Sequence, residues 1–417
     1  MSTSTTPTPT PAPAPQTPSS GGGAGGIAEV ARERLRALRE GELGALPIVV
    51  GIVIIAIYFQ ARNSNFLTAG NFVNLLAQMS AITIIGMGVV FVLLLGEIDL
   101  SIGYVSGVGG AIAAILLEPG KGIPTSVALI LALGAGVVIG LLQGSFVAFI
   151  GVPSFVVTLA GLLIFNGVVL QLVGSSGTIL IQNKVVNGLA NDYVKHWMAW
   201  VIAIAAVAAF VGQQLANRYR RAQAELPNEP WVFAIGRMVV LAAFAIAVVA
   251  VADQDRGLPY ATLVVLGAFV LWTFMSQRTR FGRHVYAVGG NQEAARRAGI
   301  NVKGVQLAVF AISGLMASLG GIILASRLNS VDTATGGGTT LLYSIAAAVI
   351  GGTSLFGGRG QVRSALLGAI VIAMIDNGLG LLNVSAATKF IVTGFVLAAA
   401  VTLDSLARRG RVATGRA

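Results

Sequence analysis

Residues that could carry chemistry are sparse in this chain of 417 residues. The chain has no cysteine, which excludes disulfides, thiolate nucleophiles and cysteine metal sites. Its two histidines, His196 and His284, are far apart in the sequence, which argues against a zinc site of the common types. The segment Gly120-Lys121-Gly122 lacks the spacing and the following hydroxyl of a phosphate-binding loop. We therefore expect no catalytic residue, no cofactor and no ATP hydrolysis by this chain itself.

Ionisable residues within apolar segments are the next candidates, because each costs about 2.5–3.5 kcal/mol to insert into a membrane. Asp376 is the only clear acid in the middle of such a segment, which is too few acids for a proton relay. An ion channel would need a selectivity filter or rings of like charge, and the sequence shows neither. The remaining class is a translocation pathway driven by a separate motor protein. Polar residues within the apolar segments are candidates to line this pathway, with interhelical hydrogen bonding as the alternative for each: Asn74, Gln78, Gln143, Ser154, Thr158, Asn166, Gln171, Asp376, Asn377 and Asn383.

The composition indicates that most of the chain lies in lipid. It is 55% hydrophobic and 10% charged, whereas soluble domains are about 25% charged. Segments long enough to approach the roughly 20 residues of a spanning helix recur along the chain. We predict an all-α polytopic membrane protein with about twelve spans (ten to twelve), at residues 46–60, 76–95, 103–117, 126–149, 153–173, 198–213, 234–252, 258–275, 305–325, 341–354, 364–384 and 387–403. The segment 341–354 is a candidate for a re-entrant or broken helix, and 76–117 for two half-helices around a break.

The distribution of Lys and Arg predicts the orientation. If the N-terminus is inside, 20 of the 27 basic residues fall on cytoplasmic segments and seven fall outside. Both termini and the loop 276–304 are then cytoplasmic, and the loop 174–197 is the largest outer one. Topology accounts for the net charge of +11, so no nucleic-acid partner is needed.

The ends of the chain differ from the membrane domain, which we place at 44–405. Residues 1–26 are rich in Pro, Thr and Gly and predict a disordered tail. Residues 27–43 have the pattern of an amphipathic, charged lead-in helix on the cytoplasmic side, with a membrane-surface anchor as the alternative. Residues 406–417 are expected to be a basic cytoplasmic tail.

The loop 276–304 contains signals for a short helix. Gly289-Gly290 predicts a flexible stop, Asn291 is a good N-cap, and the run that follows favours helix until Gly299. An acid at Glu293 near the start, and two arginines near the end, suit the helix dipole. An ordinary solvated loop helix is the alternative to a docking element.

Two glycine-containing motifs lie at predicted helix breaks. In G-E-I-D-L-S-I-G (96–103), Asp99 and Ser101 are candidate caps for a helix that begins near residue 102. The spacing from Gly96 to Gly103 matches that from Gly351 to Gly358, which suggests an internal repeat, with chance as the alternative. Elsewhere, small residues four apart predict close helix packing, at Gly136, Gly140 and Gly144, at Gly314 and Ser318, and at Ala317 and Gly321.

Three segments resemble a known family, the ribose/xylose permeases of sugar ABC transporters. The run V-G-G-N-Q-E-A-A-R-R-A-G-I-N-V resembles their coupling-helix loop, G-E-I-D-L-S-I-G their G-x-I-D-L-S-V-G motif, and I-A-A-A-V-I-G-G-T-S-L-F-G-G-R-G (345–360) their late Gly-rich motif. The length and the spans around 198–275 look most like the xylose branch. The resemblance identifies an ATPase-coupling helix with Asn291, Gln292, Glu293, Ala294, Arg296, Arg297 and Gly299. It also identifies gate or helix-break residues, Gly96, Glu97, Asp99, Ser101, Gly103, Gly351, Gly352, Thr353, Ser354, Gly357 and Gly358.

The resemblance implies an importer subunit in a bacterial inner membrane. A solute-binding protein would deliver a monosaccharide such as xylose or ribose, two permease chains would form the pathway, and a cytoplasmic ATPase would bind and hydrolyse ATP. The alternatives are the permease of a branched-chain amino-acid importer and an ion-coupled carrier. No conspicuous buried charge pair is visible in the sequence, which favours a neutral sugar over a zwitterionic amino acid.

Overall fold

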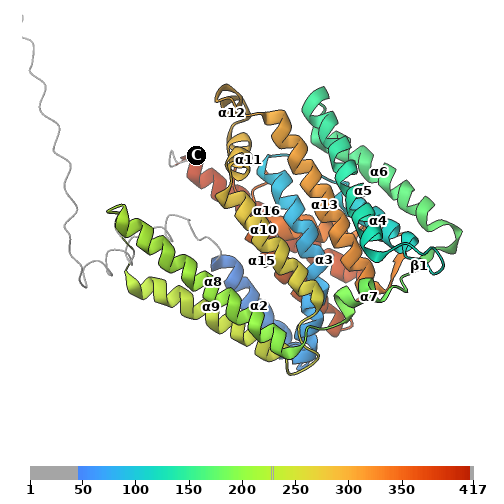
Figure 1. Cartoon of the computed structure of the whole chain (residues 1–417), viewed down its shortest axis with the longest axis horizontal. Coiled ribbons are helices and arrows are strands. Elements are labelled where there is room, and N and C mark those ends of the chain that lie inside the picture. Colours follow the sequence, from blue (N-terminus) through green and yellow to red (C-terminus); the bar gives the residue numbers. More distant parts are fainter. Residues whose placement is uncertain (1–45, 227, 229, 414–417) are drawn as a thin grey trace, which may run out of the picture.

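A computed structural model describes residues 46–413 apart from 227 and 229, and the described chain is almost entirely helical (Figure 1). Eight helical segments are long and apolar enough to cross a membrane, and four shorter apolar helices accompany them. These helices confirm the predicted all-α polytopic class. The eight long segments are α3 (Ala69–Leu94), α5 (Thr125–Ser145) continued by a π-helical turn (Phe146–Ile150), α6 (Ser154–Val173) continued by a 3-10 turn (Gly174–Ser176), α8 (His196–Gln223), α9 (Trp231–Ala252), α10 (Tyr260–Arg278), α13 (Val302–Leu328) and α15 (Val362–Leu381). The shorter ones are α2 (Leu46–Arg62), α4 (Ile102–Leu116), α14 (Thr339–Ile350) and residues Ala386–Ala399 of α16 (Ala386–Ala413).

Helices α3 and α13 form the centre of the bundle. In their most apolar stretches, 72% of α3 and 61% of α13 are buried, and both helices pack on each other along their lengths. Helices α8 and α9 are the opposite case, with 6% and 11% buried, and Figure 1 shows them as a hairpin at one edge of the molecule. Their apolar surfaces therefore face outward, as expected for lipid contact.

Glycines allow α5 and α13 to pack backbone against backbone. A Cβ atom at Gly140 would collide with the carbonyl oxygen of Phe310, and one at Gly314 with that of Gly136. Lipid provides no hydrophobic drive between helices, so close van der Waals contact has to hold them together. The predicted role of the small-residue pattern is confirmed at this crossing.

Substitution of Gly140 tests this packing. We expect Gly140→Val to lower the free energy of unfolding by about 1–3 kcal/mol or more, because the added side chain forces α5 away from α13. Gly134→Val in the same helix is the control, since a Cβ at Gly134 meets no atom within 4 Å. Thermal unfolding of the purified proteins in detergent measures the difference, and equal melting temperatures would contradict the packing argument.

Two of the short helices cross only part of the bundle. With 15 and 12 residues, α4 and α14 are about 22 and 18 Å long, whereas a bilayer core is about 30 Å thick. Helix α4 begins beside the middle of α13, because Ser106 and Gly109 pack against Gly321 and Ser318. Non-helical segments, 95–101 before α4 and 351–361 after α14, cover the remaining depth. A break at 95–101 is present as expected, but the two half-helices expected within 76–117 are wrong, because α3 has 26 residues and is long enough to cross a bilayer. Helix α14 is short and ends at Ile350, in agreement with the broken helix expected near 341–354.

Several predicted boundaries were wrong. Helix α3 begins at Ala69 rather than at residue 76, because Thr68 caps it by accepting from the Asn71 N–H and its first turns are polar. Helix α8 continues to Gln223 rather than 213 through residues that favour helices in water, and α16 continues to Ala413. The backbone of 406–413 is thus helical. The segments 1–26 and 27–43, and residues 414–417, lie outside the described residues.

The loop 174–197 has secondary structure of its own. It contains strand β1 (Thr178–Leu180) and helix α7 (Lys184–Asn191), and β1 pairs antiparallel with β2 (Ser330–Asp332). Figure 1 shows these elements at the end of the bundle opposite to α11 (Arg280–Gly290) and α12 (Gln292–Arg297). The two ends of the bundle are therefore structurally distinct.

Candidate functional site

The predicted docking loop folds into two short helices joined by a sharp bend. Asn291 adopts an extended conformation between α11 and α12, and its Oδ1 accepts from the Ala294 N–H at 2.9 Å. Gly299, with φ of +80°, ends the second helix, and the Ile300 N–H returns to the Ala295 carbonyl at 3.0 Å. The predicted N-cap and C-terminal glycine are confirmed. Helix α11 ends at Gly290, as expected of a stop, and both glycines are helical.

Helix α12 presents a charged face to solvent. Glu293 forms ion pairs with Arg296 at 3.3 Å and with Arg297 at 3.2 Å, and the three side chains are 57–80% exposed. Gln292 and Ala294 are also exposed, whereas Ala295 is buried and anchors the helix. Exposed pairs of this kind contribute little to stability, so the charges are available to a partner protein.

Helix α11 touches both helix breaks through glycine backbones. A Cβ atom at Gly289 would collide with the carbonyl oxygen of Leu94, which itself accepts from the Gly358 N–H at 2.9 Å. A Cβ at Gly357 would lie 2.7 Å from the Gly289 oxygen and 2.9 Å from the Gly96 nitrogen. We call this meeting of Gly96, Gly289, Gly357 and Gly358 the glycine junction. It joins the three motifs that the sequence singled out separately.

A side-chain hydrogen bond strengthens this connection. The Tyr286 hydroxyl in α11 donates to the Gly360 carbonyl oxygen at 2.8 Å. Burial raises the pKa of Tyr286, so its hydroxyl remains a donor across the physiological range. Helix α11 is therefore connected to the segment 351–361 by two contacts, the tyrosine and the glycine junction.

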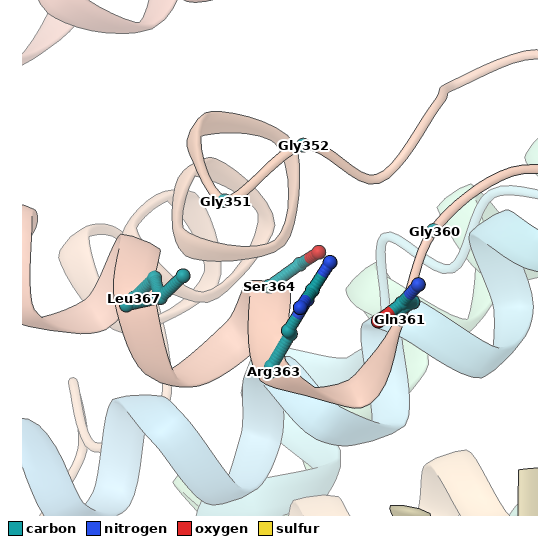
Figure 2. Close-up of a pocket in the computed structure, with 7 residues that line it drawn as sticks. All are labelled: Gly351, Gly352, Gly360, Gln361, Arg363, Ser364 and Leu367. Atoms are coloured by element: carbon teal, nitrogen blue, oxygen red, sulfur yellow. The ribbon is translucent and has the colours of Figure 1, made fainter. Parts of the chain in front are cut away.

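The segment 351–361 also borders a small polar pocket between the end of α14 and the start of α15 (Figure 2). Figure 2 shows the Arg363 side chain extending beside Ser364 across this opening. Within the segment, Gly351 packs on the backbone of Ser364, and the Ser354 N–H bonds to the Arg359 carbonyl at 2.9 Å. The pocket holds about 160 Å³ and is lined by Gly351, Gly352, Gly360, Gln361, Arg363, Ser364 and Leu367. Of the remaining candidates in this segment, Thr353 is buried and Gly352 is exposed.

The first break is held by a buried polar network around Asp99. Its carboxylate accepts from the Ser101 hydroxyl at 2.7 Å, the Ser101 N–H at 3.0 Å and the Ser313 hydroxyl at 2.8 Å. The Gln143 amide donates to the Ser101 oxygen at 2.8 Å. Helix α4 begins at Ile102 as expected, but the Ser101 side chain makes no capping bond to it, because its hydroxyl is committed to Asp99.

Helix α6 supports the same break from the other side. The Ser154 hydroxyl accepts from the Ile98 N–H at 3.1 Å, and the Thr158 hydroxyl donates to the Ile98 carbonyl at 3.0 Å. Gln143, Ser154 and Thr158 thus connect α5 and α6 to the non-helical segment 95–101, and their role as pathway lining stays a prediction. Nearby, Glu97 accepts from Gln306 at 3.2 Å, and a Cβ at Gly103 would collide with the Gly336 carbonyl.

A second polar cluster lies away from the breaks. Asp376 in α15 accepts from the Gln78 amide in α3 at 2.6 Å and from the Tyr343 hydroxyl in α14 at 3.4 Å. The Lys389 ammonium in α16 lies 3.6 Å from the same carboxylate. We call these four residues the Asp376 cluster. Asn377, the next residue, accepts from Asn71 at 2.9 Å.

The Asp376 cluster contains a charge pair that the sequence does not reveal. The Asp376 and Lys389 side chains are 24% and 25% exposed and face each other, so the pair is partly rather than fully buried. No sequence signal indicated Lys389, Tyr343 or Asn71. The pair is not apparent from the sequence, because Lys389 lies in the first turn of α16, at the end of an apolar segment.

The other pathway candidates lie apart from both clusters. Asn74 accepts from Arg256 at 2.8 Å, next to the Arg256–Asp255 ion pair. This pairing, mainly the hydrogen bond from Arg256, holds the pKa of Asp255 below its usual value. Asn166 is half-buried, whereas Gln171 and Asn383 are exposed. Within the described part of the chain, no three His, Asp or Glu side chains gather as a metal site would require.

Comparison with known proteins adds the family. Residues 71–401 match the family described as the branched-chain amino acid transport system / permease component. The chain is similar to the xylose transport system permease protein XylH of Escherichia coli K12, at 36% identity over 89% of this chain and 94% of that protein. It is also similar to the ribose import permease protein RbsC and the D-allose transport system permease protein AlsC of the same organism. The identity to RbsC is 32% over 86% of this chain and 92% of that protein, and to AlsC 31% over 85% and 89%. No solved structure matches the chain.

Proposed function

We propose that this chain, which belongs to the branched-chain amino acid transport system / permease component family, is the membrane-spanning subunit of a bacterial ABC importer for a monosaccharide. Its long similarity to permeases named for xylose, ribose and D-allose supports a sugar, and the first of these favours a pentose such as xylose. The family description also names branched-chain amino acids, which makes an amino-acid importer the second candidate.

The observation that carries this proposal is the connection of α12 to both helix breaks. An exposed charged helix follows directly on α11, and α11 contacts both breaks at the glycine junction. A cytoplasmic ATPase docked on α12 would therefore act on 95–101 and 351–361 at once. Such rigid-element movement around a discontinuous helix is a common way to alternate access in transporters.

The proposal extends to partners and orientation. A solute-binding protein would deliver the sugar, a second permease chain, most simply an identical one, would complete the pathway, and both termini would be cytoplasmic in the bacterial inner membrane. Figure 1 supports the orientation, since the C-terminal end of α16 lies at the same end of the bundle as α11 and α12. Of the pathway candidates, we retain Gln78, Asp376 and Asn377, which are half-buried and join α3 to α15 through hydrogen bonds.

Replacing Glu293, Arg296 and Arg297 together by alanine tests the docking surface. We expect the triple variant to lose copurification with the ATPase and at least about tenfold in transport, because the partner loses its charged contacts while α12 remains a good helix. The matched control replaces Arg220 and Arg221, two exposed basic residues at the end of α8 on the same predicted side. Sugar import that continued without the ATPase and followed a proton gradient would contradict the proposal.

A further inference from the structure

We infer that the Asp376 cluster is a low-affinity contact site for the hydroxyl groups of a neutral polyhydroxylated solute. This inference rests on the proposed function and deepens it, because it names the residues in the pathway that meet the sugar. The cluster joins Gln78 of α3, Tyr343 of α14, Asp376 of α15 and Lys389 of α16. A site formed by four helices changes its shape whenever these helices move.

The chemistry of the cluster matches a sugar hydroxyl, which donates one hydrogen bond and accepts others. Asp376 supplies acceptor oxygens, and Lys389, Gln78 and Tyr343 supply donors on the same centre. Of the helices involved, α14 is the partial one that ends at the segment 351–361. Tyr343 thus connects the cluster to the element that the proposed ATPase contact moves.

Two contacts of the cluster are loose enough to exchange for a ligand. The Gln78–Asp376 bond is short at 2.6 Å, whereas Tyr343 lies at 3.4 Å and Lys389 at 3.6 Å from the carboxylate. A charged pair with good geometry is about 2.7–2.9 Å apart. The Lys389 ammonium therefore keeps donor capacity, and about a quarter of its side chain is exposed.

The charges of the cluster are compensated within the protein. Asp376 is balanced by Lys389, and Arg327 at the end of α13 is a second cation near enough to interact with it. A sugar hydroxyl can bond between Asp376 and Lys389 without removing either charge. Weak binding suits a pathway, since tight binding would slow release.

The absence of cysteine from the chain permits a direct test. In the complete importer, Gly380→Cys places the only thiol of this chain beside the cluster, since a Cβ at Gly380 lies 3.2 Å from the Lys389 Nζ, and it keeps all four residues of the cluster. Ala387→Cys places a thiol on an exposed position of the neighbouring helix α16 as the control. We expect excess xylose to slow alkylation at position 380 severalfold and to leave position 387 unchanged, and leucine to protect neither. Equal rates with and without xylose at position 380 would overturn the inference, as would protection by leucine alone.

A second pair of variants separates binding from a purely structural ion pair. Asp376→Asn should lower xylose transport about tenfold, since it weakens a bond that forms during passage. Asp376→Asn combined with Lys389→Met removes both charges and should stay low, whereas full recovery in the double variant would assign the pair to structure only. Xylose import by the unmodified complex is measured in parallel. Its absence would count against the proposed function, while normal import without protection at position 380 would count against this site alone.

Discussion

Gly289→Ala should abolish transport, although it adds only one methyl group. The new Cβ would collide with the Leu94 carbonyl oxygen and approach the Gly358 nitrogen to 2.9 Å, so α11 could not remain against either break. Backbone atoms on both sides leave no flexible side chain to yield. We expect a loss of transport larger than about a hundredfold, equivalent to about 2.7 kcal/mol or more in the coupling step.

The neighbouring glycine is the matched control for this prediction. A Cβ at Gly290 meets no atom within 4 Å, and alanine is the better helix former by about 0.5–1 kcal/mol. Gly290→Ala should therefore leave transport and thermal stability unchanged or slightly higher. Sugar uptake and ATPase stimulation in proteoliposomes measure both variants, and a detergent melting curve reports folding. If Gly289→Ala matched Gly290→Ala in all three, the glycine junction would have no role in coupling.

Asp99→Ala is expected to be the most destabilising substitution of a polar residue among those considered. It leaves the Ser313 hydroxyl and the Ser101 N–H without their acceptor, in positions where both residues are fully buried. Each unsatisfied buried group costs about 1–3 kcal/mol, so the free energy of unfolding should fall by several kcal/mol. When the segment 95–101 between α3 and α4 loses this support, the amount of folded protein in the membrane should fall.

An exposed aspartate with a similar local pattern separates burial from turn formation. Asp332 accepts from the Thr335 hydroxyl at 2.7 Å and from the Ala334 N–H at 3.0 Å, but its own side chain is exposed. Asp332→Ala should cost only about 1 kcal/mol, because water replaces the lost bonds. Thermal unfolding of the two variants in the same detergent compares them. Similar shifts would mean that the buried network around Asp99 contributes no more than an ordinary turn.

The cluster at Asp376 shows why contacts between distant segments were missing from the sequence interpretation. The sequence indicates Asp376 and Gln78 as candidates, because they are polar residues within apolar segments, but it gives no such signal for Lys389 or Tyr343. Nothing near these residues in the chain indicates that four helices bring them together. The same holds for Ser154 and Thr158, whose bonds to Ile98 bridge more than 50 residues.

What the sequence by itself determined are the features that depend on neighbours within a few residues or on overall solubility. Apolar runs predicted the spans, and the cap at Asn291 and the glycine at position 299 predicted α12, since both signals act within one helical turn. Only the tertiary structure decided that Gly289 is a close-packing residue. That role depends on Leu94 and Gly358, which are far from it in the chain and reach it only when α3, α11 and the segment after α14 are packed together.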